Sequence, residues 1–536
     1  PRGVCCEQQN FFEPVMERYI RFPSFSGSHG WQWWREIYMN DSTVWTWDPA
    51  DELWRNHRPV PTPRVSPLRC ASWDSDAQVV VMFGGEGNHE GTRVYDPYTN
   101  TWTVMNPPRE PDDRSGGNMV YDSANKLHIL FGAQFTDDPH TWAYDLRKNE
   151  WRDLAPPEMP PTNKNDAVLA YDSLNRVIIA IVRVEEEDDD DTVAHLETWT
   201  FDVARNRWTK MNPPQEPDRS GSRARVLSFA PELGLTILKN CTSQRHSGSR
   251  EQQIWTYCYG RPVLDRLAPP SAPTGLQVKT TKNAAELSWQ QEPAVPGAKY
   301  NVYRGTGEPP WKVDLKKIAT VDGEEMSYRD EEIEPNTICH YAVRARVGEL
   351  ESEFSQRVRT QPRIVENVVV SVLAPNRVDV SWKAPEAGDV VGYRIERAPV
   401  EVWSEDQLVR LKQRTTPLEK PSVGAIRRIG KFERLNDKPL TEMRYEDEVD
   451  LKEPVAAGED PIYDSRMYSE HLDSRGKPYR YGVYAYRVRA VNALGVESGP
   501  SPYVLTIPSA PQWPYSREDG NTCELKWKPN PEKNLK

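Results

Sequence analysis

The residues best suited to hold a ligand gather in one stretch near the start of the chain. His29, Trp31, Trp33, Trp34 and Arg35 combine three indole rings with an imidazole and a guanidinium. Indole rings stack on sugar rings and act as anchors in protein interfaces, while the two nitrogen-bearing groups add hydrogen bonds. We therefore predict a binding site here. A second interpretation stays open, because exposed Trp clusters are rare and this segment can instead fold back over a neighbouring unit.

An acidic run forms a second candidate site. Seven consecutive carboxylates begin at Glu185. Calcium accepts oxygen ligands of this kind, but the run lacks the alternating spacing of a known calcium loop. We favour a solvated charge run, and so predict no metal site, with calcium as the alternative. The candidate calcium ligands are Glu187, Asp188, Asp189, Asp190 and Asp191.

Catalytic motifs are missing from the rest of the sequence. It has no nucleophile elbow, no phosphate-cradling glycine loop and no zinc-binding His pair. The nine His residues are scattered, and His128 falls in an apolar run where packing is the expected role. We predict no catalytic residue and no cofactor, and we leave enzymatic activity open.

A repeat sets the elements that position these candidates. Four times an aromatic residue is followed by Asp and, seven places after the aromatic, by Trp, with turn-forming residues between them. Such a pattern predicts a β-hairpin. The copies are Trp47-Asp48…Trp54, Tyr95-Asp96…Trp102, Tyr144-Asp145…Trp151 and Phe201-Asp202…Trp208.

A second hairpin pattern lies between these copies. Pairs of residues ten apart enclose an acidic turn and an apolar run, as in Trp73…Phe83 and Tyr121…Phe131. The repeated Trp residues are 48, 49 and 57 residues apart, which suits four-stranded units. A fifth, degenerate unit follows around Phe229 and Tyr257.

Over residues 1–262 the chain resembles the kelch-repeat family. The resemblance rests on the repeated Tyr-Asp with its later Trp, on Gly84-Gly85 after Phe83 and on Gly132 after Phe131. The resemblance implies a β-propeller like the central domain of galactose oxidase, with at least five units here and an incomplete N-terminal side. In copper-radical oxidases of that type the site needs two His, two Tyr and a Cys, and the scattered His residues of this chain do not supply it. Copper is therefore only an alternative.

The second half of the chain resembles fibronectin type III modules. Trp289 and Tyr300 in the first copy, and Trp382 and Tyr393 in the second, occupy the positions of sandwich core residues. We expect modules at 263–361 and 362–508, the latter with an insertion at about 401–442, and the start of a truncated third at 509–536. The fold class is therefore all-β, a propeller followed by immunoglobulin-like sandwiches. Cys339 and Tyr484 are expected at the tyrosine-corner positions.

Charge and hydropathy limit the classes of partner that we expect. A net charge of −12 without a basic tract argues against nucleic-acid binding, and no apolar stretch is long enough for a transmembrane helix. Cys241 and Cys258 can face each other on neighbouring strands of the fifth unit, and we favour free buried thiols over a disulfide.

These observations predict a non-catalytic binding or scaffold protein. The propeller serves as a platform for a protein or glycan ligand, and the modules serve as spacers or docking domains. The architecture implies a secreted, periplasmic or cell-surface location. Two alternatives remain: a copper-oxidase-like or carbohydrate-active enzyme whose catalytic residues lie largely elsewhere, and a structural envelope or assembly component.

Overall fold

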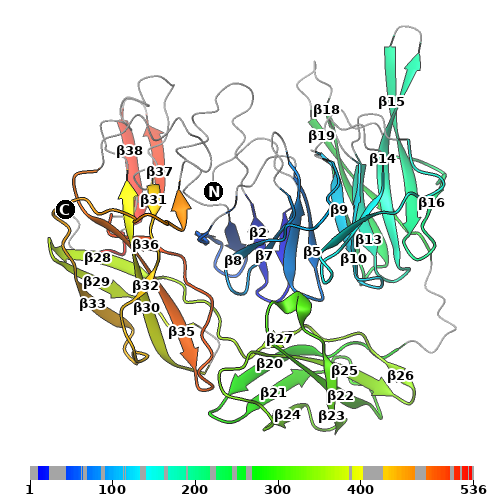
Figure 1. The fold of residues 1–536 in the computed structure, drawn as a ribbon. Coiled ribbons are helices and arrows are strands. Elements are labelled where there is room, and N and C mark those ends of the chain that lie inside the picture. Colours follow the sequence, from blue (N-terminus) through cyan, green and yellow to red (C-terminus); the bar gives the residue numbers. More distant parts are fainter. Residues whose placement is uncertain are drawn as a thin grey trace.

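The computed structural model consists almost entirely of antiparallel β-sheets, which confirms the all-β expectation (Figure 1). The helical element in the described part is a single 3-10 turn, η2 (Pro310–Lys312). The structure describes residues 10–22, 44–61, 63, 69–85, 91–112, 114, 116–132, 140–161, 167–188, 191–217, 225–243, 250–260, 269–385, 389–402, 426–464, 479–507, 512–519, 522–528 and 530–533.

Five sheets follow one another along residues 10–260, and in each the strands pair in chain order. Sheet 1 contains β1 (Phe11–Glu13), β2 (Arg18–Arg21), β3 (Trp45–Asp48) and β4 (Leu53–Asn56). Sheet 2 contains β5 (Cys70–Asp74), β6 (Val79–Phe83), β7 (Arg93–Asp96) and β8 (Thr101–Val104). Sheet 3 contains β9 (Asn118–Asp122), β10 (Leu127–Phe131), β11 (Trp142–Asp145) and β12 (Glu150–Asp153). Sheet 4 contains β13 (Ala167–Asp172), β14 (Val177–Asp188), β15 (Asp191–Asp202) and β16 (Arg207–Lys210), and sheet 5 contains β17 (Val226–Ala230), β18 (Leu235–Ser243) and β19 (Arg250–Tyr257). The first strands β5, β9, β13 and β17 lie against one another in that order.

Both hairpin patterns are confirmed by the strand register. In the aromatic-Asp repeat the aromatic residue pairs directly with its Trp, as Tyr95 does with Trp102. The Asp side chain closes the turn, since Asp96 Oδ1 accepts a hydrogen bond from the backbone N–H of Tyr98 at 2.9 Å. The turn ends on Asn100, whose φ of 54° lies in the left-handed region that Asn tolerates. These turn residues explain why the repeat forms hairpins.

Neighbouring sheets pack face to face through the aromatic residues of the repeat. Phe83 at the end of β6 lies 5.0 Å from Trp151 of sheet 3, and Phe131 of β10 lies 4.7 Å from Trp208 of sheet 4, measured between ring centroids. All four rings are buried. Burying an aromatic side chain contributes about 3 kcal/mol, so the repeated Trp is a main attachment of each sheet to the sheet before it.

Polar bonds fix the relative position of the packed sheets. Trp151 Nε1 donates to Thr92 Oγ1 of the preceding sheet at 2.8 Å, and Trp208 Nε1 donates to Thr141 Oγ1 at 2.9 Å. Each Thr lies three residues before the repeat aromatic of its own sheet. Because a buried indole N–H without an acceptor costs free energy, these bonds favour one register of the sheets.

The left-handed Asn of the turn makes a second inter-sheet bond. Asn149 Nδ2 donates to the backbone carbonyl of Met105 in the preceding unit at 2.7 Å, and Asn149 Oδ1 accepts from Tyr144 Oη at 2.7 Å. Asn100 Nδ2 donates in the same way to the carbonyl of His57 at 2.7 Å. The residue that sequence reasoning assigned to the turn therefore also joins two sheets.

Two β-sandwiches follow the five sheets. Sandwich 1 pairs β20 (Thr274–Thr280), β21 (Ala285–Gln290) and β24 (Ser327–Asp330) in one layer, and β23 (Lys316–Asp322), β22 (Lys299–Thr306), β25 (Cys339–Val347), β26 (Leu350–Glu351) and β27 (Val358–Arg359) in the other. Sandwich 2 pairs β28 (Val369–Ala374), β29 (Arg377–Ser381) and β33 (Arg444–Glu448), opposite β34 (Tyr463–Asp464), β31 (Ile426–Ile429), β30 (Val390–Val402), β32 (Glu433–Arg434), β35 (Val483–Asn492) and β36 (Val504–Leu505). A last hairpin joins β37 (Gln512–Asp519) and β38 (Thr522–Lys528).

The expected core aromatics of both sandwiches are buried as edge-to-face pairs. The ring centroids of Trp289 and Tyr300 are 5.6 Å apart, and those of Trp382 and Tyr393 are 5.3 Å apart. This confirms the positions assigned from the sequence.

The expected tyrosine-corner positions are wrong by two residues. Tyr341, not Cys339, donates its hydroxyl proton to Asp330 Oδ2 at 2.7 Å, and Tyr486, not Tyr484, donates to an Asp of its own module. In both modules the acceptor is a side chain that an Arg also pairs with, so the bond is charge-assisted.

The expectations for Cys241 and Cys258 and for the insertion at about 401–442 are only partly confirmed. Cys241 pairs with Gln252 in the β18–β19 register, whereas Cys258 lies beyond the other end of β19, so the two residues do not face each other. Cys258 is a free, exposed thiol. Most of the insertion expected at about 401–442, from 403 to 425, lies outside the described residues, and its final part supplies β31 and β32 to the sheet of β30.

The indole–hydroxyl bond is missing between sheets 1 and 2, where Val44 stands at the Thr position. Within the described residues Trp102 Nε1 has no hydrogen-bond partner. Val44→Thr should therefore raise the free energy of unfolding by about 1 kcal/mol, and Thr92→Val should lower it by about 1–3 kcal/mol by orphaning Trp151. Urea unfolding followed by near-UV circular dichroism measures both. A destabilised Val44→Thr variant would contradict this explanation of the sheet contact.

Candidate functional site

The five sheets have two different ends. Because their strands pair in chain order, all first-to-second and third-to-fourth connections leave the same end, and each is a tight four-residue turn. Turns of adjacent sheets touch, as Lys126 Nζ and Asp76 Oδ1 do at 2.7 Å. We call this the tight-turn end. Its turns are 14–17, 49–52, 75–78, 97–100, 123–126, 146–149, 173–176, 203–206 and 231–234.

The opposite end carries the connections between the second and third strands, and we call it the long-loop end. Figure 1 shows the β14–β15 hairpin rising beyond the neighbouring strands there. Both sequence-predicted candidate sites fall in connections of this kind, His29–Arg35 between β2 and β3 and the acidic run between β14 and β15.

The structure leaves both predicted sites untested. His29, Trp31, Trp33, Trp34 and Arg35 lie outside the described residues. Glu187 and Asp188 end β14 and Asp191 begins β15 opposite Asp188, so the acidic run forms the tip of the hairpin, while Asp189 and Asp190 lie outside the described residues. Among the residues that the structure describes, no group of three His, Cys, Asp or Glu side chains is arranged to hold a metal ion.

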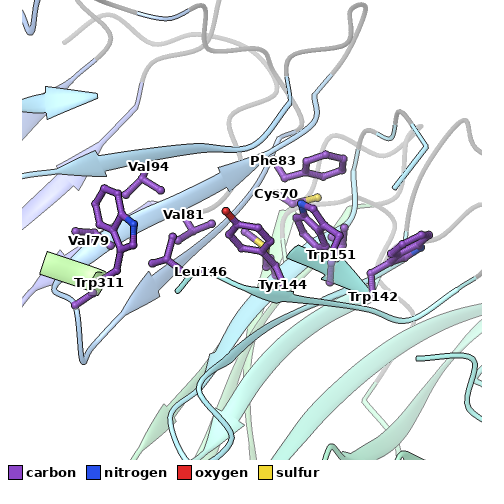
Figure 2. Close-up of a cluster of buried hydrophobic side chains, with 13 residues drawn as sticks. Cys70, Val79, Val81, Phe83, Val94, Trp142, Tyr144, Leu146, Trp151 and Trp311 are labelled. Atoms are coloured by element: carbon purple, nitrogen blue, oxygen red, sulfur yellow. The ribbon is translucent and has the colours of Figure 1, made fainter. Parts of the chain in front are cut away.

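Sandwich 1 contacts the tight-turn end of sheets 2 and 3 by inserting a Trp side chain between them. Trp311 of η2 is 9% exposed and lies against Val79, Val94 and Leu146, between sheets 2 and 3 (Figure 2). Burying this indole removes most of its apolar surface from water, and such burial contributes about 3 kcal/mol. The side chain is therefore an anchor of the sandwich on the sheets.

A buried ion pair lies beside this anchor. Arg359 Nη1 of β27 contacts Asp96 Oδ2 at 2.7 Å, and their side chains are 1% and 8% exposed. The guanidinium also lies 4.7 Å from the centre of the Tyr98 ring, as does that of Arg363, and Tyr98 Oη donates to the carbonyl of Gln361 at 2.7 Å. The segment joining the two sandwiches is thus held by one turn of sheet 2.

Sandwich 2 completes this junction. Asn492 Nδ2 donates to the carbonyl of Thr360 at 2.7 Å. Gly499 approaches the turn of sheet 2 so closely that an added Cβ would lie 2.0 Å from the carbonyl oxygen of Thr99. Only glycine fits there, because backbone rather than a movable side chain stands opposite. Both sandwiches are docked on the sheets.

A buried His lies where sheet 1 meets the segment between the sandwiches. His57 Nε2 is 2.7 Å from Thr46 Oγ1, and Glu366 forms an ion pair with Arg18 nearby. Burial lowers the pKa of His57 to about 4. Burial alone would raise the pKa of Glu366, but the hydrogen bond and charge of Arg18 reverse the effect and lower it. The imidazole is neutral at pH 7 and the carboxyl is ionised.

One Ser, one His and one Asp meet inside sheets 2 and 3. Ser72 Oγ is 2.7 Å from His128 Nδ1, and Asp74 Oδ2 is 3.4 Å from His128 Nε2. These residue types form nucleophilic triads, but here they are 1%, 0% and 4% exposed, so a substrate does not reach them. The ring of Tyr121 packs 4.8 Å from that of His128, and the packing role expected for His128 is confirmed.

Sequence reasoning missed the junction residues. Asp96 and Arg359 are 263 positions apart, and a single buried Arg has no periodic signal in a sequence. The nearest hint was the segment Glu308-Pro309-Pro310-Trp311, where an aromatic residue follows a Pro-rich stretch. Nothing in it indicates which surface the Trp fills.

Likenesses to known proteins are found among solved structures. No protein-family model matches the chain, and no curated protein matches it. The structural matches include a two-domain fibronectin type III segment of chicken tenascin, 14% identical over 44% of this chain and 97% of that chain, with a TM-score of 0.18. Another is a Fn3-like protein from Clostridium thermocellum, 28% identical over 17% of this chain and 92% of that chain, with a TM-score of 0.15. At such scores these likenesses carry no argument.

Removing the buried Arg should loosen the junction. Arg359→Ala leaves the Asp96 carboxylate buried without its partner, which should cost about 3–5 kcal/mol. The double variant Asp96→Asn with Arg359→Met removes both charges and should recover most of this loss. Urea unfolding and amide exchange of turn 97–100 report the effect. Equal losses in the single and double variants would show that the ion pair does not hold the junction.

The buried imidazole predicts a pH dependence. Since the pKa of His57 is about 4 in the folded protein and 6.5 when unfolded, the unfolded chain takes up a proton first as the pH falls. Stability contributed by the neutral ring is present above pH 6.5 and decreases towards pH 4, by roughly 3 kcal/mol. His57→Gln should flatten this part of the profile of unfolding midpoint against pH. An unchanged slope in the variant would mean that other groups carry the acid sensitivity.

Proposed function

We propose that this chain is a non-catalytic binding protein in which the five sheets form a kelch-type propeller platform and fibronectin type III modules hold that platform from one end. The ligand is a protein or glycan of a cell surface or extracellular matrix. It binds at the long-loop end through side-chain stacking and hydrogen bonds rather than through bond making.

One observation carries the proposal: the protein's own sandwiches cover the tight-turn end where sheets 2 and 3 meet. Trp311 and the Arg359–Asp96 pair are buried there, so that part of the surface is not free to take a partner. The long-loop end carries the longer connections, including the hairpin tip with the acidic run. Binding residues concentrate on loops positioned by a rigid scaffold, which favours this end as the ligand surface.

The His29–Arg35 segment is the proposed contact, because it joins β2 to β3 and so belongs to the long-loop end. Three indoles beside cationic and polar groups suit flat sugar faces or a protein anchor pocket. The acidic run belongs to the corresponding connection of sheet 4, between β14 and β15. A location outside the cytoplasm belongs to the same proposal.

The test is ligand capture by the full chain. The purified protein is applied to a polysaccharide array and to a panel of extracellular-matrix proteins, beside a variant lacking residues 25–35. We expect the deletion to weaken capture at least about tenfold while the unfolding midpoint stays unchanged, because interface anchors carry most of the binding energy.

Arg147→Ala is the matched control, since Arg147 lies at the tight-turn end and its ion pair with Asp314 is exposed. This variant should bind as well as the parent. A folded deletion variant that still captures ligand would remove the loop from the site. Self-association of the parent protein without capture of any ligand would favour the structural-component alternative instead.

A further inference from the structure

The repeated Trp is buried in three sheets and half-buried in one. Trp102, Trp151 and Trp208 are 8%, 5% and 1% exposed, and each lies against a Phe of the sheet that precedes it in the chain. Trp54 holds the same position in sheet 1 and is only half-buried. Neither Trp54 nor Trp47, its partner in register, belongs to a hydrophobic cluster of the described residues.

Strand register places these two rings on the face of sheet 1 that points away from sheet 2. Ile20 and Thr46 pair with each other, are 0% and 1% exposed, and lie on the side packed against sheet 2. Alternation along a strand puts Trp47 and Trp54 on the other side. Phe12, on that side as well, is 55% exposed. Among the described residues, sheet 1 therefore presents an aromatic face without a neighbouring sheet, whereas the same face of sheets 2 to 4 is covered by one.

Sheet 5 does not supply the missing neighbour. At the position of Phe83 it has Lys239, and at the position of Thr92 it has Ile254, which is 66% exposed. These residues offer Trp54 neither an aromatic ring nor a hydroxyl acceptor. A direct contact of sheet 5 with sheet 1, in this chain or between two copies, would lack both features of the other interfaces.

We propose that the aromatic face of sheet 1 docks one further four-stranded sheet of the same repeat, placed before sheet 1 in the repeat order. On this face of sheets 2, 3 and 4 the occupant is always the preceding unit, and the face of sheet 1 continues that series. The docking sheet presents a Phe at the end of its second strand to pack on Trp54. It also presents a Thr at the start of its third strand to accept from Trp54 Nε1.

The proposed interface lacks the inter-sheet hydrogen bond that the turn Asn donates to a backbone carbonyl in the other sheets. Glu52, with a φ of 57°, stands where Asn100 and Asn149 stand in their turns, and a carboxylate does not donate to a backbone carbonyl. The docking sheet is therefore held by ring packing and the indole bond alone. This inference concerns the stacking of sheets and is independent of what the long loops bind.

The test supplies such a sheet from the protein's own repeat. A copy of residues 111–156, which contains all of sheet 3, is fused ahead of residue 1 of the full chain. Residues 154–156 and 1–10 then join the copied Asp153 to Phe11, and this connection is as long as the natural 154–166 connection. We expect amide exchange in β3 and β4 to slow at least about tenfold, because docking buries their outer face.

The control fusion carries Phe131→Ser and Thr141→Val in the copied sheet only, and should leave exchange in β3 and β4 at the rate of the unfused chain. In the unfused chain Trp54→Ala should lower the unfolding midpoint far less than Trp151→Ala. Equal protection by both fusions, or no protection by either, would overturn the proposal. So would equal losses for the two Ala variants, since Trp54 would then already be covered from within the chain.

Discussion

Burial of the repeated Trp against the preceding sheet is the constraint on which the first half of this protein depends. Four-stranded sheets of such short strands have two apolar faces and little stability alone. Stacking hides those faces, and the Phe83–Trp151 contact with its Thr92 bond shows how one sheet fixes the next. The aromatic and Asp residues of the motif make the turn that brings the Trp into place.

The same constraint explains how the two halves of the chain are joined. Asp side chains and left-handed residues fix the conformation of the tight turns. Turns of fixed conformation form a surface on which another domain can pack. Trp311 fills the space between two sheets, while Arg359 reaches a carboxylate that would otherwise be costly to bury. The sandwiches thereby become part of one body with the sheets. Ligand binding is proposed for the connections at the opposite end.

How much the sequence revealed follows from the range of each interaction. The hairpins and core pairs such as Trp289 with Tyr300 were predictable, because turn residues and alternation act over a few positions. The tyrosine-corner position was assigned to Cys339 instead of Tyr341, since only the packed strand shows which side chain reaches the carboxylate of Asp330. The junction was out of reach, because Asp96 and Arg359 are brought together only by the complete fold. The predicted loop site remains a prediction.

Native-state amide exchange at increasing urea tests the central claim that sandwiches and sheets form one body joined at the tight-turn end of sheet 2. The account predicts that residues 357–366 and turn 97–100 lose protection together with strands β5 to β8, in one cooperative step. Rapid exchange of residues 357–366 while β5 to β8 stay protected would contradict it, because the sandwiches would then move independently and leave the tight-turn end open.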